Sequence, residues 1–157
     1  FGTIRAAVST FDTYSHIGPW QNFEKAIRRA AFFMEKGGVF LFDLNTPYKN
    51  RQVLGENLFT FEGPDASCRW QNHYLAEEQA VEISIDIHYN DTDEDFHEQF
   101  KEYSYELQQV TQALEKYGFA VQSVEDGESF GALQPDSQRF IFTCIKQYTQ
   151  EGADQHE

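Results

Sequence analysis

The sequence predicts an α/β fold in which a mostly parallel sheet carries an inserted antiparallel meander. A short strand, an amphipathic helix and an apolar strand come first, strictly alternating segments fill the middle, and a helix with two strands closes the pattern. We assign a βαβ portion to residues 1–48, the antiparallel insertion to 49–104, a helix with the final two strands to 105–148, and a frayed tail to 149–157.

The first portion has the sequence form of a parallel βαβ unit. Residues 1–10 have the small and apolar side chains of a strand, and apolar positions recur at threes and fours from Trp20 to Glu35, as on a helix with one buried face. Gly37 is expected to end this helix as a left-handed cap. The run from Val39 to Phe42 is apolar throughout, which predicts a strand covered on both faces.

The middle of the chain alternates between apolar and polar residues. Residues 66–78 and 80–90 show long alternations, and a third extended run covers 96–105 after the acidic turn NDTDED. Three consecutive extended segments joined by short polar turns predict an antiparallel meander with one wet face.

The last portion returns to a helical pattern. Apolar positions from Leu107 to Leu114 share one face, and Gly118 is expected to cap the end of that helix. Residues 119–124 and 140–145 predict two more strands, joined by a polar loop that is long enough to act as a lid or a mobile rim.

Composition excludes several classes of partner. The chain has 26 acidic against 12 basic residues, a formal net charge of −14, and its basic residues form no patch, so nucleic acid is not an expected partner. No apolar run is long enough for a membrane span, and no signal peptide is visible, so we expect a cytoplasmic protein. Cys68 and Cys144 match neither metal-ligand nor redox spacing and are expected to be reduced. Because the chain starts with Phe1 rather than Met, we expect a processed or partial polypeptide.

Polar residues follow the two predicted parallel strands where each strand ends. Asp12 comes after the first strand, and Asp43 and Asn45 come at the end of the second. In open parallel sheets, ligands bind outside the carboxyl ends of the strands. These side chains therefore predict a ligand site, although Asp12 is equally suited to capping a helix and Asp43 and Asn45 to forming a turn before Pro47.

The chain resembles class I S-adenosylmethionine-dependent methyltransferases, in the second half of their sequence. The resemblance rests on the order and spacing of EKGGVFLFDLNTPYK, WQNHY, ELQQVTQALEKYGF and SQRFIFTCIKQ, and it spans nearly the whole chain. The family's Gly-Gly strand segment, its Gly-Phe pair after a helix and its last strand are matched here by Gly37, Gly38, Phe42, Asp43, Asn45, Thr46, Gly118, Phe119, Ser137, Arg139 and Phe140. The resemblance implies a Rossmann-like methyltransferase sheet, of which only the later strands are present, with a substrate-facing antiparallel insertion.

Two departures from the family pattern limit what the resemblance implies. Ser15 and His16 stand where the family usually has an Asn-Tyr pair, and no Gly-x-Gly occurs, so the turn that cradles the cofactor is not present in these residues. We therefore expect the chain alone to be inactive. The strand over residues 3–10 would be an open edge, which invites self-association or pairing with a missing N-terminal half.

The resemblance also implies which residues contact ligands. S-adenosylmethionine is the implied cofactor, with Thr10, Phe11 and Asp12 as the residues that bind it. A small-molecule substrate would then contact Tyr14, His16, Asn45, Tyr48, Arg51, Trp70, His73 and Arg139. Methyl transfer needs in-line positioning more than acid or base strength, and aromatic faces attract the cationic sulfonium. Alternatively, these aromatic residues only fill the core beneath the insertion.

Other chemistries find little support in the sequence. His73, His88 and His97 fall on three extended segments, where scattered histidines are common on a wet face, so we expect no metal site. The acidic run from Asp91 to Glu102 has calcium-loop spacing but lacks the required Gly. No catalytic residue is identifiable. The sequence therefore predicts a methyltransferase region acting on a small molecule or, alternatively, a non-catalytic interaction module that pairs its open edge with another chain.

Overall fold

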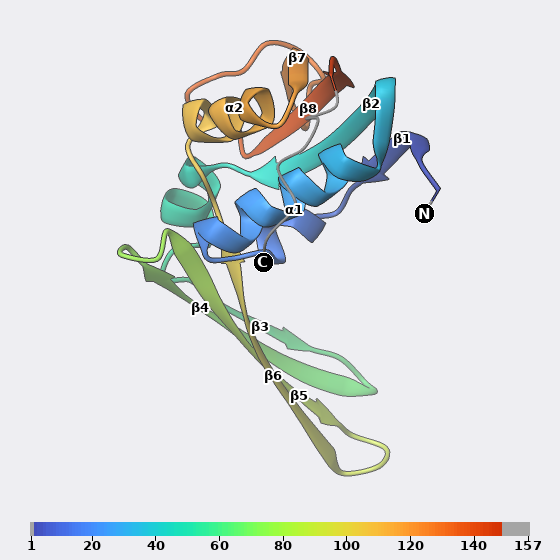
Figure 1. The fold of residues 1–157 in the computed structure, drawn as a ribbon. Helices are drawn as coiled ribbons and strands as arrows, with labels where there is room; N and C mark the ends of the chain where they lie inside the picture. Colours follow the sequence, from blue (N-terminus) through green and yellow to red (C-terminus); the bar gives the residue numbers. More distant parts are fainter. Residues whose placement is uncertain (1, 149–157) are drawn as a thin grey trace.

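The structure is a computed structural model, and it describes residues 2–148 (Figure 1). Its strands form two separate four-stranded sheets, ordered β1-β2-β8-β7 and β3-β4-β5-β6. The first sheet contains β1 (Ile4–Ser9), β2 (Met34–Asn45), β7 (Phe119–Asp126) and β8 (Arg139–Lys146), and the second contains β3 (Leu58–Glu62), β4 (Ala66–Leu75), β5 (Ala80–Tyr89) and β6 (Glu94–Tyr103). The helices are α1 (Trp20–Phe33) and α2 (Leu107–Lys116), with a 3₁₀ turn η1 (Thr13–His16) and a π-helix η2 (Lys49–Leu54).

The predicted βαβ unit is confirmed. β1 pairs with β2 in parallel, with Ala7 opposite Phe40, and α1 is the crossover between them. The predicted end of the helix is wrong, because α1 stops at Phe33 and β2 begins at once. Met34 is extended and buried in the core, so packing straightens the chain there, and Gly37 takes its positive φ of 82° inside the strand.

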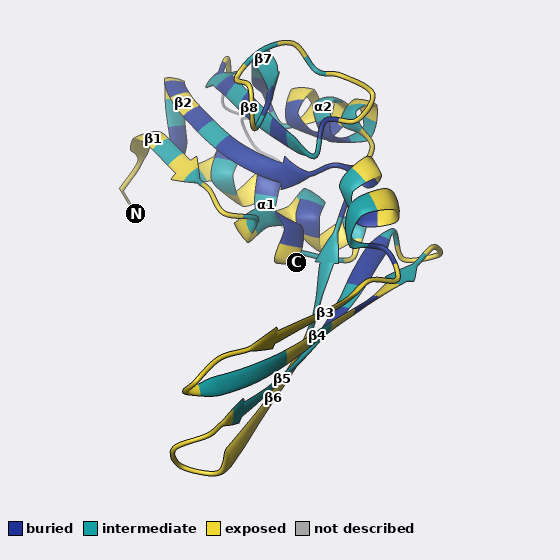
Figure 2. Ribbon diagram, turned by 180° about the vertical axis from the view of Figure 1, so that it is seen from behind, coloured by how far each residue is buried: buried dark blue, intermediate teal, exposed yellow. Residues whose placement is uncertain are grey.

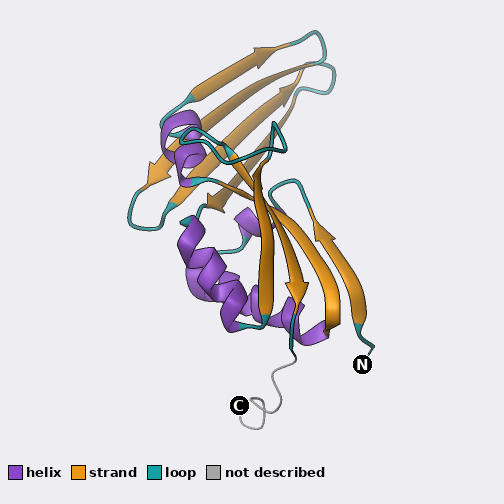
Figure 3. Ribbon diagram, turned by 90° about the horizontal axis from the view of Figure 1, so that it is seen from above, coloured by secondary structure: helices purple, strands orange, loops and turns teal. Residues whose placement is uncertain are grey.

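Both helices lie on the same side of the first sheet (Figure 3). The core between sheet and helices contains the side chains that alternate inward along β2, namely Phe40, Phe42 and Leu44. On the opposite face, Val8 is 70% exposed and Val39 is 38% exposed. The prediction that both faces of the β2 run are covered is therefore wrong for residues 2–148.

The last portion follows the prediction closely. α2 is amphipathic, with Val110 and Leu114 buried, and Gly118 has the expected left-handed conformation with φ of 84°. β8 lies antiparallel between β2 and β7, so among residues 2–148 the two edges of this sheet are β1 and β7. No helix among residues 2–148 combines the length and the apolar character that crossing a membrane requires.

The antiparallel insertion has one strand more than predicted. β3 escaped prediction because all five of its residues are exposed, and an exposed edge strand needs no alternation of apolar and polar side chains. The second sheet projects away from the first (Figure 1). This sheet is more buried where it approaches the first sheet than at its far end (Figure 2). Val81 and Ile83 are buried, whereas Tyr89 and Phe96 are exposed.

Candidate functional site

An arginine joins two carboxylates at the carboxyl ends of β1 and β2. Arg139, the first residue of β8, donates a hydrogen bond of 2.7 Å from Nη1 to Asp43 Oδ2. Its other terminal nitrogen, Nη2, lies 2.9 Å from Asp12 Oδ1 and 3.1 Å from Asp12 Oδ2. Asp43 is buried, and Arg139 is only partly exposed, so the arrangement is a largely desolvated ion pair shared between two acids. Arg139 therefore connects the start of β8 to the end of β2 and to the turn that follows β1.

Asp43 also holds an unusual turn after β1. Phe11 and Asp12 both have positive φ, at 58° and 61°, a conformation that is uncommon for residues other than glycine. Their backbone N–H groups donate hydrogen bonds of 3.1 Å to the two oxygens of the Asp43 carboxylate. The turn presents the Phe11 side chain to solvent, with 86% of it exposed. Backbone strain that neighbouring groups maintain in this way is commonly found at ligand sites.

A third acid reaches the same strand ends from the antiparallel insertion. Glu102, near the end of β6, accepts a hydrogen bond of 2.8 Å from Asn45 Nδ2 through its Oε2. Its Oε1 lies 3.9 Å from His16 Nε2. Lys49 Nζ donates to Asn45 Oδ1 at 2.8 Å, and Asn50 Nδ2 donates to the Glu102 carbonyl at 3.1 Å. Glu102 therefore belongs to a polar network that links the two sheets.

The environment of Glu102 favours its neutral form. Burial raises the pKa of the Glu102 carboxyl, and the charge of Asp12 raises it further. His16, Lys49 and Arg139 act in the opposite direction without reversing the shift. A carboxylate whose pKa is raised accepts a proton more readily than an exposed glutamate does.

We expect Glu102→Gln to stabilise the fold at pH 7. Because the folded state raises the pKa of this carboxyl, stability falls as pH rises from about 4.3, the unfolded value, through the folded value. Glutamine keeps the shape and an acceptor for Asn45 but removes that cost. Melting temperatures of both proteins measured across pH should show the variant ahead at pH 7 and the difference vanishing in acid. Glu98→Gln, on an exposed position of the same strand, should have little effect; a variant less stable than wild type at pH 7 would contradict the expectation.

The structure brings five of the eleven predicted ligand-binding residues together at these strand ends. Phe11, Asp12 and Arg139 lie around Asp43, and His16 and Asn45 lie around Glu102. Thr10 precedes this turn, and its carbonyl accepts a hydrogen bond of 2.8 Å from the Thr13 hydroxyl.

The other predicted residues lie apart from this cluster. Tyr14 packs against Phe23, Phe40 and Phe42 in the core, where burial raises its pKa to about 12. Arg51 donates hydrogen bonds to Tyr74 and Glu106, and His73 pairs with Glu56. In the insertion, Trp70 meets the ring of Phe59 edge-on. Tyr48 directly precedes η2, and its side chain is partly exposed. Their predicted role in substrate binding stays a prediction, and Tyr14 has the contacts of a core residue.

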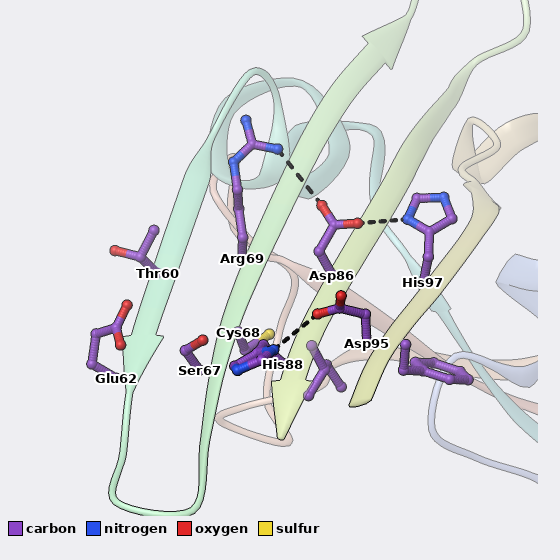
Figure 4. A pocket seen from close by; sticks show the side chains of 11 residues that line it. Thr60, Glu62, Ser67, Cys68, Arg69, Asp86, His88, Asp95 and His97 are labelled. Atoms are coloured by element: carbon purple, nitrogen blue, oxygen red, sulfur yellow. Dashed lines mark hydrogen bonds and ion pairs between the residues drawn. The ribbon is translucent and has the colours of Figure 1, made fainter. Parts of the chain in front are cut away.

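The polar face of the insertion carries its own set of charged contacts (Figure 4). His97 Nδ1 lies 2.6 Å from Asp86 Oδ1, Arg69 lies 3.7 Å from the other oxygen of Asp86, and His88 Nδ1 lies 3.0 Å from Asp95 Oδ1. They line an open depression of about 520 Å³. No group of three or more metal-ligating side chains occurs within residues 2–148. These pairs are cross-strand contacts of an exposed sheet face.

Sequence reasoning missed Glu102, Lys49 and Asn50 as members of the site. In the sequence, Glu102 is the last position of the acidic run that begins at Asp91, but β6 places it at the end of the strand opposite that turn. The available signal was the alternation of β6, which places Glu102 on the same face as Phe100, and Phe100 contacts His16.

Comparison with known proteins gives matches in structure only. No family model matches the sequence, and no curated protein sequence does either. An S-adenosylmethionine-dependent methyltransferase from Clostridium acetobutylicum matches with a TM-score of 0.85 at 21% identity, over 94% of this chain and 60% of that protein. The CcbJ methyltransferase from Streptomyces caelestis matches with a TM-score of 0.79 at 11% identity, over 94% and 59%. The sugar N-methyltransferase KedS8 from Streptoalloteichus matches with a TM-score of 0.64 at 15% identity, over 94% and 57%.

These matches extend over most of this chain, but the chain spans only about 60% of the length of the proteins that it matches. The matched strands include both sheets, since 94% coverage leaves room for neither to be omitted. Residues 2–148 therefore have the fold of the corresponding part of class I S-adenosylmethionine-dependent methyltransferases.

Proposed function

We propose that the chain acts in methyl transfer from S-adenosylmethionine to a small molecule, as one part of a methyltransferase sheet. The observation that carries this proposal is the convergence of the ends of β1, β2, β6 and β8 on one polar cluster around Asp43 and Glu102. In a methyltransferase fold, that edge of the sheet is where ligands bind.

The turn after β1 is the part of this chain that would hold the cofactor. Phe11 presents an exposed aromatic face, to which a sulfonium cation is attracted, and Asp12 adds a carboxylate beside it. When bound, the cofactor would supply an electrophilic methyl group. Thr10, Phe11 and Asp12 would hold the cofactor. Because Asp43 fixes the turn that carries them, these residues would already be in position before the cofactor binds.

A small-molecule acceptor suits the residues that the antiparallel insertion brings to the cluster. His16 and Asn45 contact Glu102, and Arg139 pairs with Asp12. Among the proteins of the same fold, KedS8 is a sugar N-methyltransferase and CalS10 is an amino pentose methyltransferase. We infer that a small polar acceptor binds here, in a cytoplasmic protein.

The chain is expected to need further structure for this activity. Among the described residues, 2–148, no strand pairs with the outer side of β1, and the second face of the first sheet exposes Val8 and Val39. The 157 residues contain no Gly-x-Gly turn for the cofactor. We propose that additional strands, from an N-terminal half or another chain, pair with β1 and supply that turn, and that the chain alone is inactive.

The same open edge favours the alternative function, a non-catalytic interaction module. Light scattering after size-exclusion chromatography separates the two ideas for the isolated chain. A dimer that Val8→Lys dissolves would favour an interaction module, whereas a monomer would count against it.

Calorimetric titration with S-adenosylmethionine tests the proposed function. A protein that joins a strand and a Gly-rich turn to residues 1–157 should bind saturably, and the chain alone should bind weakly or not at all. Asp12→Asn should weaken binding about tenfold, which corresponds to ~1.4 kcal/mol. Asp91→Asn, in the exposed turn between β5 and β6, is the matched control and should bind normally. Failure of the longer protein to bind would remove the enzyme hypothesis.

A further inference from the structure

We propose that Glu102 pairs with a protonated amine on the methyl acceptor and takes the proton that this amine must lose before it is methylated. The inference rests on the proposed function and adds the chemical class of the acceptor and the residue that recognises it. It is carried by the partners of Glu102 and by an unpaired acceptor beside its backbone.

Glu102 is the acid of the cluster that lacks a close cation. Asp43 and Asp12 share Arg139, with contacts of 2.7 and 2.9 Å, and Asp43 also receives two backbone N–H groups. Within residues 2–148, the Glu102 carboxylate receives a hydrogen bond only from the neutral amide of Asn45, while His16 lies 3.9 Å away. Because its side chain is only 13% exposed, water compensates this charge poorly.

The remaining charged neighbours do not supply the missing partner. The Nζ of Lys49 donates to Asn45 Oδ1, so the amide lies between the ammonium and the Glu102 carboxylate. Arg139 is engaged by Asp12 and Asp43, and the charge of Asp12 itself acts against an ionised Glu102. An incoming cation would therefore find a carboxylate that the fold has positioned without neutralising.

A second observation also points to a ligand that donates hydrogen bonds. Asn50 is fully buried and uses its Nδ2 to hold the carbonyl of Glu102. Its Oδ1 has no hydrogen-bond partner among residues 2–148. A buried amide oxygen left without a donor costs free energy, so a donor at this position would be favoured. The Glu102 carboxylate and Asn50 Oδ1 are both hydrogen-bond acceptors, and an ammonium group has only donors.

The proton balance of the step is complete within this arrangement. An ammonium group has no lone pair, so it must first give one proton to the Glu102 carboxylate, which becomes a carboxylic acid. The free amine then forms the N–C bond as the S–C bond breaks, and sulfur keeps the electron pair. Burial, which raises the pKa of Glu102, makes the carboxylate a better proton acceptor than an exposed glutamate.

NMR titration of the 157-residue chain with D-glucosamine, without cofactor, tests the inference. D-glucose is the neutral probe of matched shape. We expect glucosamine, at a pH where its amine is protonated, to shift the side-chain signals of Glu102 and Asn45 saturably, and glucose to leave them unchanged. Glu102→Gln should weaken glucosamine binding at least about tenfold, ~1.4 kcal/mol. Glu98→Gln, on the same strand but exposed, should bind as wild type does.

Three outcomes would overturn the inference: equal shifts with glucose, no saturable shift in the wild-type chain, or unchanged binding in Glu102→Gln. Backbone spectra of the variant establish that it is folded, and its isosteric side chain keeps an acceptor for Asn45. Because the titration contains no cofactor, its result is independent of S-adenosylmethionine binding. Cofactor binding by the longer protein without a glucosamine response would sink the amine assignment and leave methyl transfer standing.

Discussion

Replacing Phe142 by alanine is expected to lower the free energy of unfolding by about 4 kcal/mol, the usual cost of removing a buried phenylalanine ring. Phe142 is fully buried in the middle of β8, between β2 and β7. Its ring stacks on Phe42 with a centroid distance of 4.8 Å and an interplanar angle of 3°, and it meets Phe140 edge-on at 6.0 Å. The cavity would lie where the core side chains of the first sheet meet.

Urea denaturation followed by circular dichroism measures this loss. Phe32→Ala is the matched control, because Phe32 is 61% exposed on α1, and its removal should change stability by roughly 0.5 kcal/mol or less. Equal losses for the two variants would mean that Phe142 is not part of a packed core.

Replacing Arg139 by methionine is expected to cost about 3 kcal/mol, because it leaves two largely buried carboxylates without a cation. Methionine keeps most of the side-chain length, so the loss reports charge more than volume. The strained turn at Phe11 and Asp12 depends on the same Asp43 carboxylate, so the variant should also loosen that turn. Hydrogen exchange of the Phe11 and Asp12 amides would detect the loosening.

A double-mutant cycle separates the ion pair from general packing. Asp43→Asn combined with Arg139→Met should cost less than the sum of the single changes, since the second change removes a charge already left unpaired. Arg69→Met is the matched control: its contact with Asp86 spans 3.7 Å with both side chains about half exposed, so it should cost less than about 1 kcal/mol. Additive costs in the cycle would show that Arg139 does not couple the strand ends.

Local patterns were sufficient to predict most of the first sheet. The apolar run of β2 and the threefold and fourfold spacing on α1 and α2 report burial directly, and Gly118 marks a helix end that needs positive φ. The end of α1 was not predictable in this way. Gly37 has the sequence signal of a cap, but the burial of Met34 in the core ends the helix earlier.

The candidate site was predicted in its residues but not in its pairings. Asp12, Asp43 and Arg139 were each singled out, yet Asp43 and Arg139 lie 96 residues apart, and only the pairing of β2 with β8 brings them together. Glu102 lies 57 residues from Asn45, and its position follows from the register of β6. A single sequence carries no local signal for contacts of such separation.

The insertion is joined to the first sheet by the side chains that surround the site. Glu102 bonds to Asn45 at the end of β2, and Asn50 in η2 bonds to the carbonyl of Glu102. A substrate held by the insertion would therefore be positioned relative to the strand ends by the same residues that recognise it. Sites built on strands and helices hold reacting groups more precisely than sites built on loops.

A crystal structure of the longer protein with S-adenosylhomocysteine is the most direct test of the central claim, that the turn after β1 holds the cofactor. We predict that the ligand contacts Phe11 and Asp12, with Arg139 still bridging Asp12 and Asp43. Ligand density away from the carboxyl ends of β1 and β2, with this turn untouched, would contradict it.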